Sequence, residues 1–326
     1  MRTEQEMYDL IIHTAREDER IRAVYMNGSR TNPNVPKDIF QDYDVVYVVT
    51  ENRPFYEDKC WIDRFGDRLY MQCPDEMDAL RGETVDFDEC FGWLVQFADG
   101  NRLDLHVEPV GRNHFTEDKL CRILLDKDGI LTGMTEPSDV DYRVKKPSEG
   151  EFLAVCNEFW WCTNNVAKGL WRKEIPYVQD MLNFYVRPEL KRLLEWKVGI
   201  LTDFTVSCGK SGKYMYCWLP ADVWERYLKT WCGTEIDAIW DAVFLMCDLF
   251  FETAAEVSGR LGFAYDEKEA QNARMYLEHV CRLPEDAAAV YSCGMQGDKY
   301  ESSFQTTDWC STAGEACGMQ GDKDDN

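Results

Sequence analysis

The sequence has few basic residues for its length. Its 326 residues include 36 lysines and arginines against 60 aspartates and glutamates, which gives a net charge of -24. Binding to nucleic acid depends on an excess of lysine and arginine that neutralises phosphates. The composition therefore argues against a nucleic-acid partner. It fits a cationic small substrate, and it fits equally a charge that only keeps the protein in solution.

Long hydrophobic runs are also missing. No window reaches the length of a membrane span, and the opening stretch "MRTEQEMYDLIIHTARED" carries charges throughout, unlike a signal peptide. The 14 cysteines include no C-x-x-C pair, and the four histidines show no metal-ligand spacing. We therefore expect a cytoplasmic protein without a membrane association, as a monomer or weak dimer, with reduced cysteines that are mostly buried.

The first part of the chain mixes helical and strand patterns. "TEQEMYDLIIHTARED" has apolar residues at helical spacing. "IRAVYM" and "DYDVVYVV" have the pattern of strands, and "GWLVQF" and "RLDLHVEPV" flank the turn dipeptide Asp99-Gly100, which predicts a hairpin. This part is expected to form a small mixed sheet with flanking helices.

The second part is helical in pattern. Ser148 and Glu151 have capping-box spacing, so a helix is expected to begin there. Its apolar stripe runs from Phe152 to Leu170 in steps of three and four, and later segments repeat the pattern. The predicted fold is α+β, with a sheet domain at 1–145 and a helical bundle at 146–291. An acidic tail at 292–326, which contains "CGMQGDK" twice, is expected to be flexible.

Three aspartates form the pattern that points to chemistry. Side chains alternate along a strand, so Asp42 and Asp44 project to one face while Tyr43, Val45 and Tyr47 project to the other. Asp104 has the same relation to Leu103 and Leu105, and it joins the pair if the two strands are neighbours. Such carboxylates repel one another unless a cation lies between them. Three acids around two magnesium ions are the usual apparatus for phosphoryl or nucleotidyl transfer.

The segment before the first aspartates is expected to bind phosphate. Gly28-Ser29 ends a strand, and a glycine turn that leads into a helix offers N–H groups and a hydroxyl to an anion. Arg30 follows directly. Simpler interpretations remain for each piece: Asp42 as a turn cap, and Asp104 as a solvated residue beside the hairpin. The ordered combination of strand, Gly-Ser, D-x-D strand and a later acid favours the catalytic interpretation.

The sequence resembles the aminoglycoside 6-nucleotidyltransferases, which are streptomycin adenylyltransferases of the nucleotidyltransferase superfamily. The likeness lies in "NGSRTNPNVPKDIFQDYDVVYVV", "EFWWCTNNVAKGLWRKEIPYVQDMLN", "GKSGKYM", "IWDAVFLMCDLF" and "LPEDAAAVY", and it extends over about 1–291. The resemblance implies magnesium-dependent transfer of AMP from ATP to a streptomycin hydroxyl, which gives antibiotic resistance. It implies that Asp42, Asp44 and Asp104 bind the metal ions and that Asp104 also takes the hydroxyl proton.

The helical part is expected to form a substrate wall. Asn157, Trp161, Asn164 and Lys168 share the face opposite the apolar stripe, and an exposed tryptophan beside amides and a lysine suits a cleft better than a solvated surface. Helix–helix packing is the competing explanation. Lys168 is assigned to the triphosphate, and Lys213 in "GKSGK" is either a second phosphate contact or part of a surface loop.

Carboxylates are the natural partners of the guanidinium groups of streptomycin. Asp180 in the helical part is the first candidate, and Glu83 and Asp86 near the sheet are further ones, although charge runs are often only solvated. Two other functions stay open at this stage. One is transfer to another small molecule or to a protein, and the other is a relative that binds ligands without catalysis.

Overall fold

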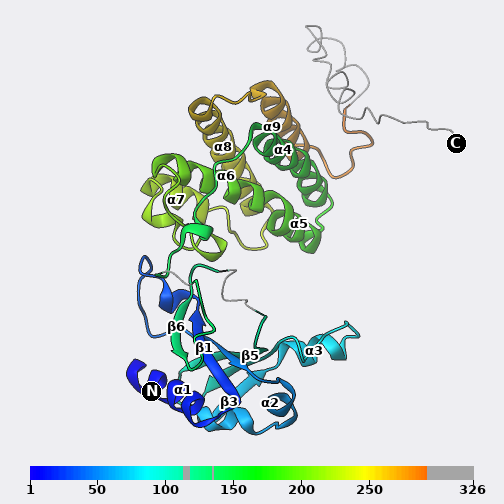
Figure 1. Ribbon diagram of the computed structural model, residues 1–326. Helices are drawn as coiled ribbons and strands as arrows, with labels where there is room; N and C mark the ends of the chain where they lie inside the picture. Colours follow the sequence, from blue (N-terminus) through cyan, green and yellow to red (C-terminus); the bar gives the residue numbers. More distant parts are fainter. Residues whose placement is uncertain (113–117, 134–135, 292–326) are drawn as a thin grey trace, which may run out of the picture.

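The computed structural model describes residues 1–112, 118–133 and 136–291. A part built on a sheet and a part built from helices lie one above the other, and the chain crosses between them after β6 (Figure 1). The helices enclose one buried apolar cluster, and the sheet part has two, a large one on the side of the N-terminal helix and a smaller one around Tyr25 and Val46. The α+β fold class is therefore confirmed. The predicted division at 145/146 stays a prediction, as does the flexible tail at 292–326, which lies outside the described residues.

The sheet has six strands in the order β3-β4-β5-β2-β1-β6. The strands are β1 (Ile21–Asn27), β2 (Tyr43–Val49), β3 (Arg68–Gln72), β4 (Phe91–Phe97), β5 (Arg102–Pro109) and β6 (Arg122–Asp126). The predicted hairpin is present as β4 and β5, with Gly100 at φ +91° in its turn. The β2–β5 pair is parallel, whereas the other pairs are antiparallel. The edge strands β3 and β6 were not predicted, because they are short and mostly exposed or half-buried.

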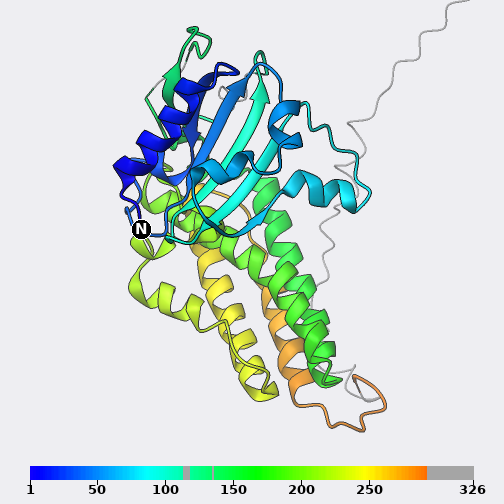
Figure 2. The same ribbon diagram turned by 90° about the horizontal axis from the view of Figure 1, so that it is seen from below.

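One face of the sheet is covered by helices of the same part. The helix α1 (Glu4–Glu17) begins at a capping box on Thr3 and buries Met7 and Ile11 against the strands. Two short helices, α2 (Arg53–Glu57) and α3 (Pro74–Leu80), and the 3-10 turn at Trp61–Phe65 complete this part. Seen from below, α1 lies across the strands on the side away from the helical part (Figure 2). The opposite face of the sheet is therefore the one turned toward the helical part.

The helical part begins where the sequence predicts. Ser148 caps α4 (Glu149–Trp171): its hydroxyl accepts from the Glu151 N–H, and the Glu151 carboxylate accepts from the Ser148 N–H, so the predicted capping box is confirmed. The other helices are α5 (Ile175–Met181), α6 (Arg187–Leu201), α7 (Ala221–Leu228), α8 (Ile236–Leu261) and α9 (Glu267–Cys281). The segment "YVQDMLNFYVRPELKRLLEWKVGIL" at 177–201, which has a helical pattern, is helical throughout, and a π-helical turn at Leu182–Val186 joins α5 to α6. Within the described ranges, none of the helices combines the length and apolar character of a membrane span.

Candidate active site

The three predicted aspartates come together on one face of the sheet. The parallel pairing of β2 and β5 places Asp44 directly beside Asp104, and Asp42 immediately precedes β2. One carboxylate oxygen from each of the three lies within 4.8 Å of the others. Oxygen ligands at this separation can hold a divalent cation such as magnesium. We refer to Asp42, Asp44 and Asp104 as the acidic triad.

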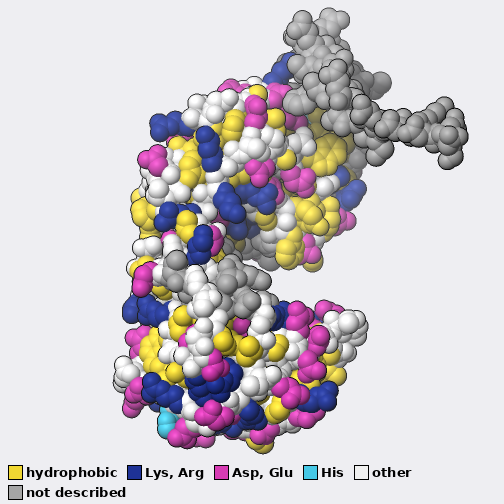
Figure 3. Space-filling view, viewed as in Figure 1, with side chains coloured by type: hydrophobic (Ala, Val, Ile, Leu, Met, Phe, Trp, Pro, Cys, Tyr) yellow, Lys and Arg dark blue, Asp and Glu magenta, His cyan; other side chains and the backbone are white. Residues whose placement is uncertain are grey.

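The triad projects from the sheet face that α1 does not cover. Tyr43, Val45 and Tyr47, which alternate with the acids along β2, are fully buried in the core on the α1 side. The sheet face opposite α1 is turned toward the helical part (Figure 1), and a hollow separates the two parts on one side of the molecule (Figure 3). The alternation of strand side chains therefore puts apolar residues into the core and the acids toward the second part of the chain.

Asp44 is the triad member with the most perturbed ionisation. The pKa of Asp44 is raised to about 7, first by burial and then by the negative charges of Asp42 and Asp104, against the opposing guanidinium groups of Arg102 and Arg30. Mutual repulsion of close carboxylates disfavours the fully ionised set. A bound cation removes that repulsion, so the residues present fit a magnesium site.

The backbone of Gly28 lies directly against the side chain of Asp44. It has φ +77° and ψ -161°, a backbone region used almost only by glycine. A Cβ atom at Gly28 would lie 1.9 Å from Oδ2 of Asp44. The predicted helix after Gly28-Ser29 is wrong, because only a 3-10 turn at Ser29–Thr31 follows before the chain runs on to β2. Glycine is required here for close approach to the carboxylate.

Arg30 is engaged with the segment that carries Asp42. Its Nε and Nη2 atoms donate to the carbonyl oxygens of Asp42 at 2.9 Å and Gln41 at 2.6 Å, and the guanidinium lies 3.7 Å from the centre of the Tyr43 ring. The amide of Gln41 donates in turn to the carbonyl of Ser29. These contacts fix the start of β2 relative to the Gly28 turn. A direct contact of Arg30 with phosphate stays a prediction.

Arg102 is a site residue that the sequence reasoning missed. Its Nε and Nη2 atoms donate to the two oxygens of Asp104 at 2.8 and 2.6 Å, and Nε lies 3.8 Å from Oδ2 of Asp42. The signal was available, because Arg102 precedes Asp104 by two positions on a strand and therefore shares its face.

His106 continues the same face of β5 beyond Asp104. Its ring lies against Gly92 on β4, where a Cβ atom would be 2.5 Å from the imidazole. Burial lowers the pKa of His106, against the opposing charges of Asp75 and Asp104. Asp75 also accepts a hydrogen bond from the Gly92 N–H at 2.8 Å. A neutral imidazole therefore lies on the same face of β5 as Asp104, packed closely against Gly92.

The remaining predicted residues are not in the triad cluster. Trp161 on α4 is 66% exposed, which confirms that its helix face lies outside the core, and Lys168 is half-buried on the same helix. Asn157, also on this face, donates to Glu269 of α9 at 3.4 Å. Asp180 is exposed on α5, and Lys213 lies over the ring of Tyr214. Their roles in binding stay predictions.

The two acids predicted near the sheet belong to an exposed loop after α3. Glu83 pairs with Arg81 at 3.3 Å, and Asp86 accepts from the N–H of Asp88 at 2.9 Å. Both side chains therefore already have partners within their own loop, and substrate binding by either one is untested.

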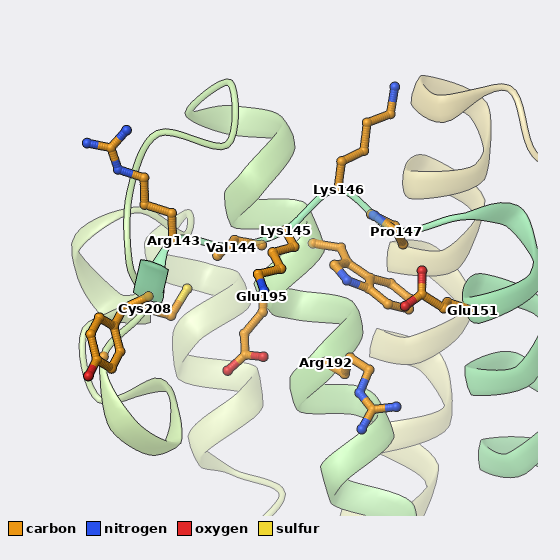
Figure 4. Close-up of a pocket in the computed structure, with 12 residues that line it drawn as sticks. Arg143, Val144, Lys145, Lys146, Pro147, Glu151, Arg192, Glu195 and Cys208 are labelled. Atoms are coloured by element: carbon orange, nitrogen blue, oxygen red, sulfur yellow. The ribbon is translucent and has the colours of Figure 1, made fainter. Parts of the chain in front are cut away.

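A pocket of about 330 Å³ lies where the connection between the two parts meets α6. The connecting residues Arg143 to Pro147 run along one side of it, and Arg192 and Glu195 project from α6 (Figure 4). Tyr142 also lines the pocket, and burial together with its hydrogen bond to Asp118 raises the pKa of its hydroxyl to about 12. The wall of this pocket therefore carries more cationic than acidic side chains.

Comparison with known proteins gives consistent matches. The model of the streptomycin adenylyltransferase family matches residues 1–280. An aminoglycoside 6-adenylyltransferase of Campylobacter jejuni is 39% identical over 273 residues, which cover 82% of this chain and 93% of that protein. The enzyme of the same name from Bacillus subtilis (strain 168) is 38% identical over 270 residues, or 82% of this chain and 94% of that protein.

A solved structure also matches. The crystal structure of an aminoglycoside 6-adenyltransferase from Bacillus subtilis has 32% sequence identity to this chain, and the match covers 87% of this chain and 100% of that one, with a TM-score of 0.43. Kinship with this family is shown by the sequence matches over most of the chain.

Proposed function

Because the chain belongs to the streptomycin adenylyltransferase family, we propose that it transfers AMP from ATP to a hydroxyl group of streptomycin, and so confers resistance to the antibiotic. The observation that carries the proposal is the convergence of Asp42, Asp44 and Asp104 within 4.8 Å on one face of the sheet. The net charge of -24 suits a cationic acceptor.

The triad would hold magnesium, in keeping with the separation of its oxygens and the raised pKa of Asp44. When bound, the metal supplies positive charge that makes the acceptor hydroxyl more acidic and neutralises the phosphates. Asp44 would be ionised at neutral pH in the loaded site, because a nearby cation favours the charged carboxylate.

The transfer itself is an in-line displacement. The acceptor oxygen forms a bond to the α-phosphorus of ATP, the bond from that phosphorus to the bridging oxygen breaks, and pyrophosphate leaves. The Asp104 carboxylate takes the hydroxyl proton. Gly28 and Ser29 approach the phosphates with their backbone, since no side chain at Gly28 blocks the way. Arg30, Lys168 and Lys213 supply positive charge to the nucleotide.

The acceptor would lie between the two parts of the chain. Trp161 offers an exposed aromatic surface, and Asp180, Glu83 and Asp86 offer carboxylates to the guanidinium groups of streptomycin. We further propose that 1–145 and 146–291 act as catalytic and substrate-binding domains. The protein is proposed to work in the cytoplasm as a monomer or weak dimer, with neither nucleic acid nor membrane as a partner.

Mass spectrometry of streptomycin after incubation with the protein, ATP and magnesium tests this proposal. The expected product is heavier by one AMP unit, and it is absent without magnesium and with the Asp44→Asn variant, which keeps the shape and removes the charge. Full turnover by Asp44→Asn would refute the metal assignment. If another aminoglycoside or a protein is modified and streptomycin is not, streptomycin is not the acceptor and the modified molecule takes its place in the proposal. Failure to release pyrophosphate with any acceptor would identify a binding relative without catalysis.

A further inference from the structure

A cationic side chain, that of Arg102, lies directly beside the acidic triad. Arg102 donates to both oxygens of Asp104, at 2.8 and 2.6 Å, and its Nε lies 3.8 Å from Oδ2 of Asp42. One guanidinium thus contacts two of the three members of the triad.

The two partners differ sharply in exposure. The Asp104 side chain is 11% exposed, whereas the Arg102 side chain is 47% exposed. A carboxylate buried to this degree is destabilised without a partner. The half-exposed arginine can swing into solvent without unpacking the core, because it lies at the first position of β5.

Arg102 occupies the same carboxylate oxygens that a metal ion bound to the triad would use as ligands. Both Asp104 oxygens accept from the guanidinium, so a divalent cation bound to the same oxygens would stand next to a second positive charge. Repulsion between cations at such a separation is strong in a partly buried site. The two cations are therefore alternatives for the same acids.

We propose that Arg102 is an internal counter-cation, which pairs with Asp104 and Asp42 in the metal-free protein and is displaced when a divalent cation binds. This inference rests on the proposed function, since it takes the triad as the metal site. Arg102 is a positioning residue in this scheme: it holds the Asp104 and Asp42 side chains in place until the cation arrives, and it lowers the cation affinity of the site.

The test measures manganese binding in the absence of nucleotide, by the electron paramagnetic resonance signal of free Mn²⁺, at about pH 8 where carboxylates are ordinarily ionised. Arg102→Met removes the competing charge and should bind Mn²⁺ about fivefold tighter than wild type, the lower end of the range for coupled sites. Arg102→Lys keeps the charge, and its affinity for Mn²⁺ should stay within about twofold of the wild-type affinity.

Arg22→Met is the matched control. Arg22 lies on β1 of the same sheet and donates to Asp128 at 2.6 Å, away from the triad. Its loss should leave Mn²⁺ affinity unchanged. Thermal melting supplies a second readout: Arg102→Met should melt below wild type without metal and recover most of the difference with saturating Mn²⁺, whereas Arg22→Met should show no such recovery.

The outcomes separate the two ideas. If folded Arg102→Met binds Mn²⁺ with the same affinity as wild type, or more weakly, the proposed role of Arg102 is wrong and the metal site still stands. Absence of binding by every variant would overturn the metal assignment in the proposed function, and the inference with it.

Discussion

Replacement of Gly28 by alanine provides a sharp test of the site geometry. The added Cβ atom would lie 1.9 Å from Oδ2 and 2.8 Å from Cγ of Asp44, whereas real contacts of this kind essentially never fall under 3.0 Å. The carboxylate oxygen must therefore move by at least 3.0 - 1.9 = 1.1 Å. A displacement of roughly 1 Å in a catalytic group can cost about a hundredfold in rate.

The backbone contributes a second cost, to stability. The φ of +77° and ψ of -161° at Gly28 lie in a region where other residues are strained by about 1–3 kcal/mol. We therefore expect Gly28→Ala to fold with a lowered melting temperature and to lose about a hundredfold in kcat for AMP transfer. The assay is steady-state release of pyrophosphate beside a thermal melt.

Gly100→Ala is the control for backbone strain. Gly100 has φ +91° in the β4–β5 turn, and a Cβ atom there meets nothing within 4 Å. This variant should lose stability and keep its turnover. If Gly28→Ala keeps a kcat within about threefold of Gly100→Ala, well short of the expected loss, the close approach of Gly28 to Asp44 does not position the carboxylate for catalysis.

Three further predictions concern stability. In metal-free protein the pKa of Asp44 is about 7 in the folded state, above its ordinary 3.8, so the contribution of Asp44 to the free energy of unfolding is greatest below pH 3.8 and falls by at most about 4 kcal/mol as the pH rises to about 7. The stabilities of wild type and Asp44→Asn, measured by denaturant titration, should therefore converge in acid and diverge toward neutral pH. Parallel curves would contradict this prediction. Gly92→Ala should cost about 1–3 kcal/mol by collision with the imidazole, and a double-mutant cycle with His106→Ala should recover part of it; strict additivity would exclude the clash. Ser148→Ala should cost about 1 kcal/mol in urea unfolding through loss of the α4 cap, and an unchanged midpoint would show that the cap is dispensable.

The sequence was most informative where a local period decides the structure. The alternation Asp42-Tyr43-Asp44 placed the acids and the core residues on opposite faces, and the structure confirms this. Asp99-Gly100 predicted the hairpin, and Ser148 with Glu151 predicted the start of α4. In each case a few neighbouring residues carry the signal, so no knowledge of distant contacts is needed.

Contacts between distant segments could not be derived in the same way. Periodicity made Asp104 a conditional member of the triad, because it does not say that β5 lies next to β2. The π-helical turn between α5 and α6 was not predicted, since it keeps the apolar residues nearly in phase. The predicted helix after Gly28 failed because the segment before β2 is held by side-chain bonds of Arg30 and Gln41 to the backbone, which propensity does not report.

The parallel pairing of β2 and β5 also bears on how such a site can be recognised across diverged sequences. Asp44 and Asp104 are 104 - 44 = 60 positions apart, yet their alignment depends only on the register of two strands. Insertions or deletions in the intervening chain leave that register intact, whereas a single-residue slip within either strand turns its acid toward the core. A sequence profile for this site should therefore hold the spacing rigid inside each strand and leave the length between them free.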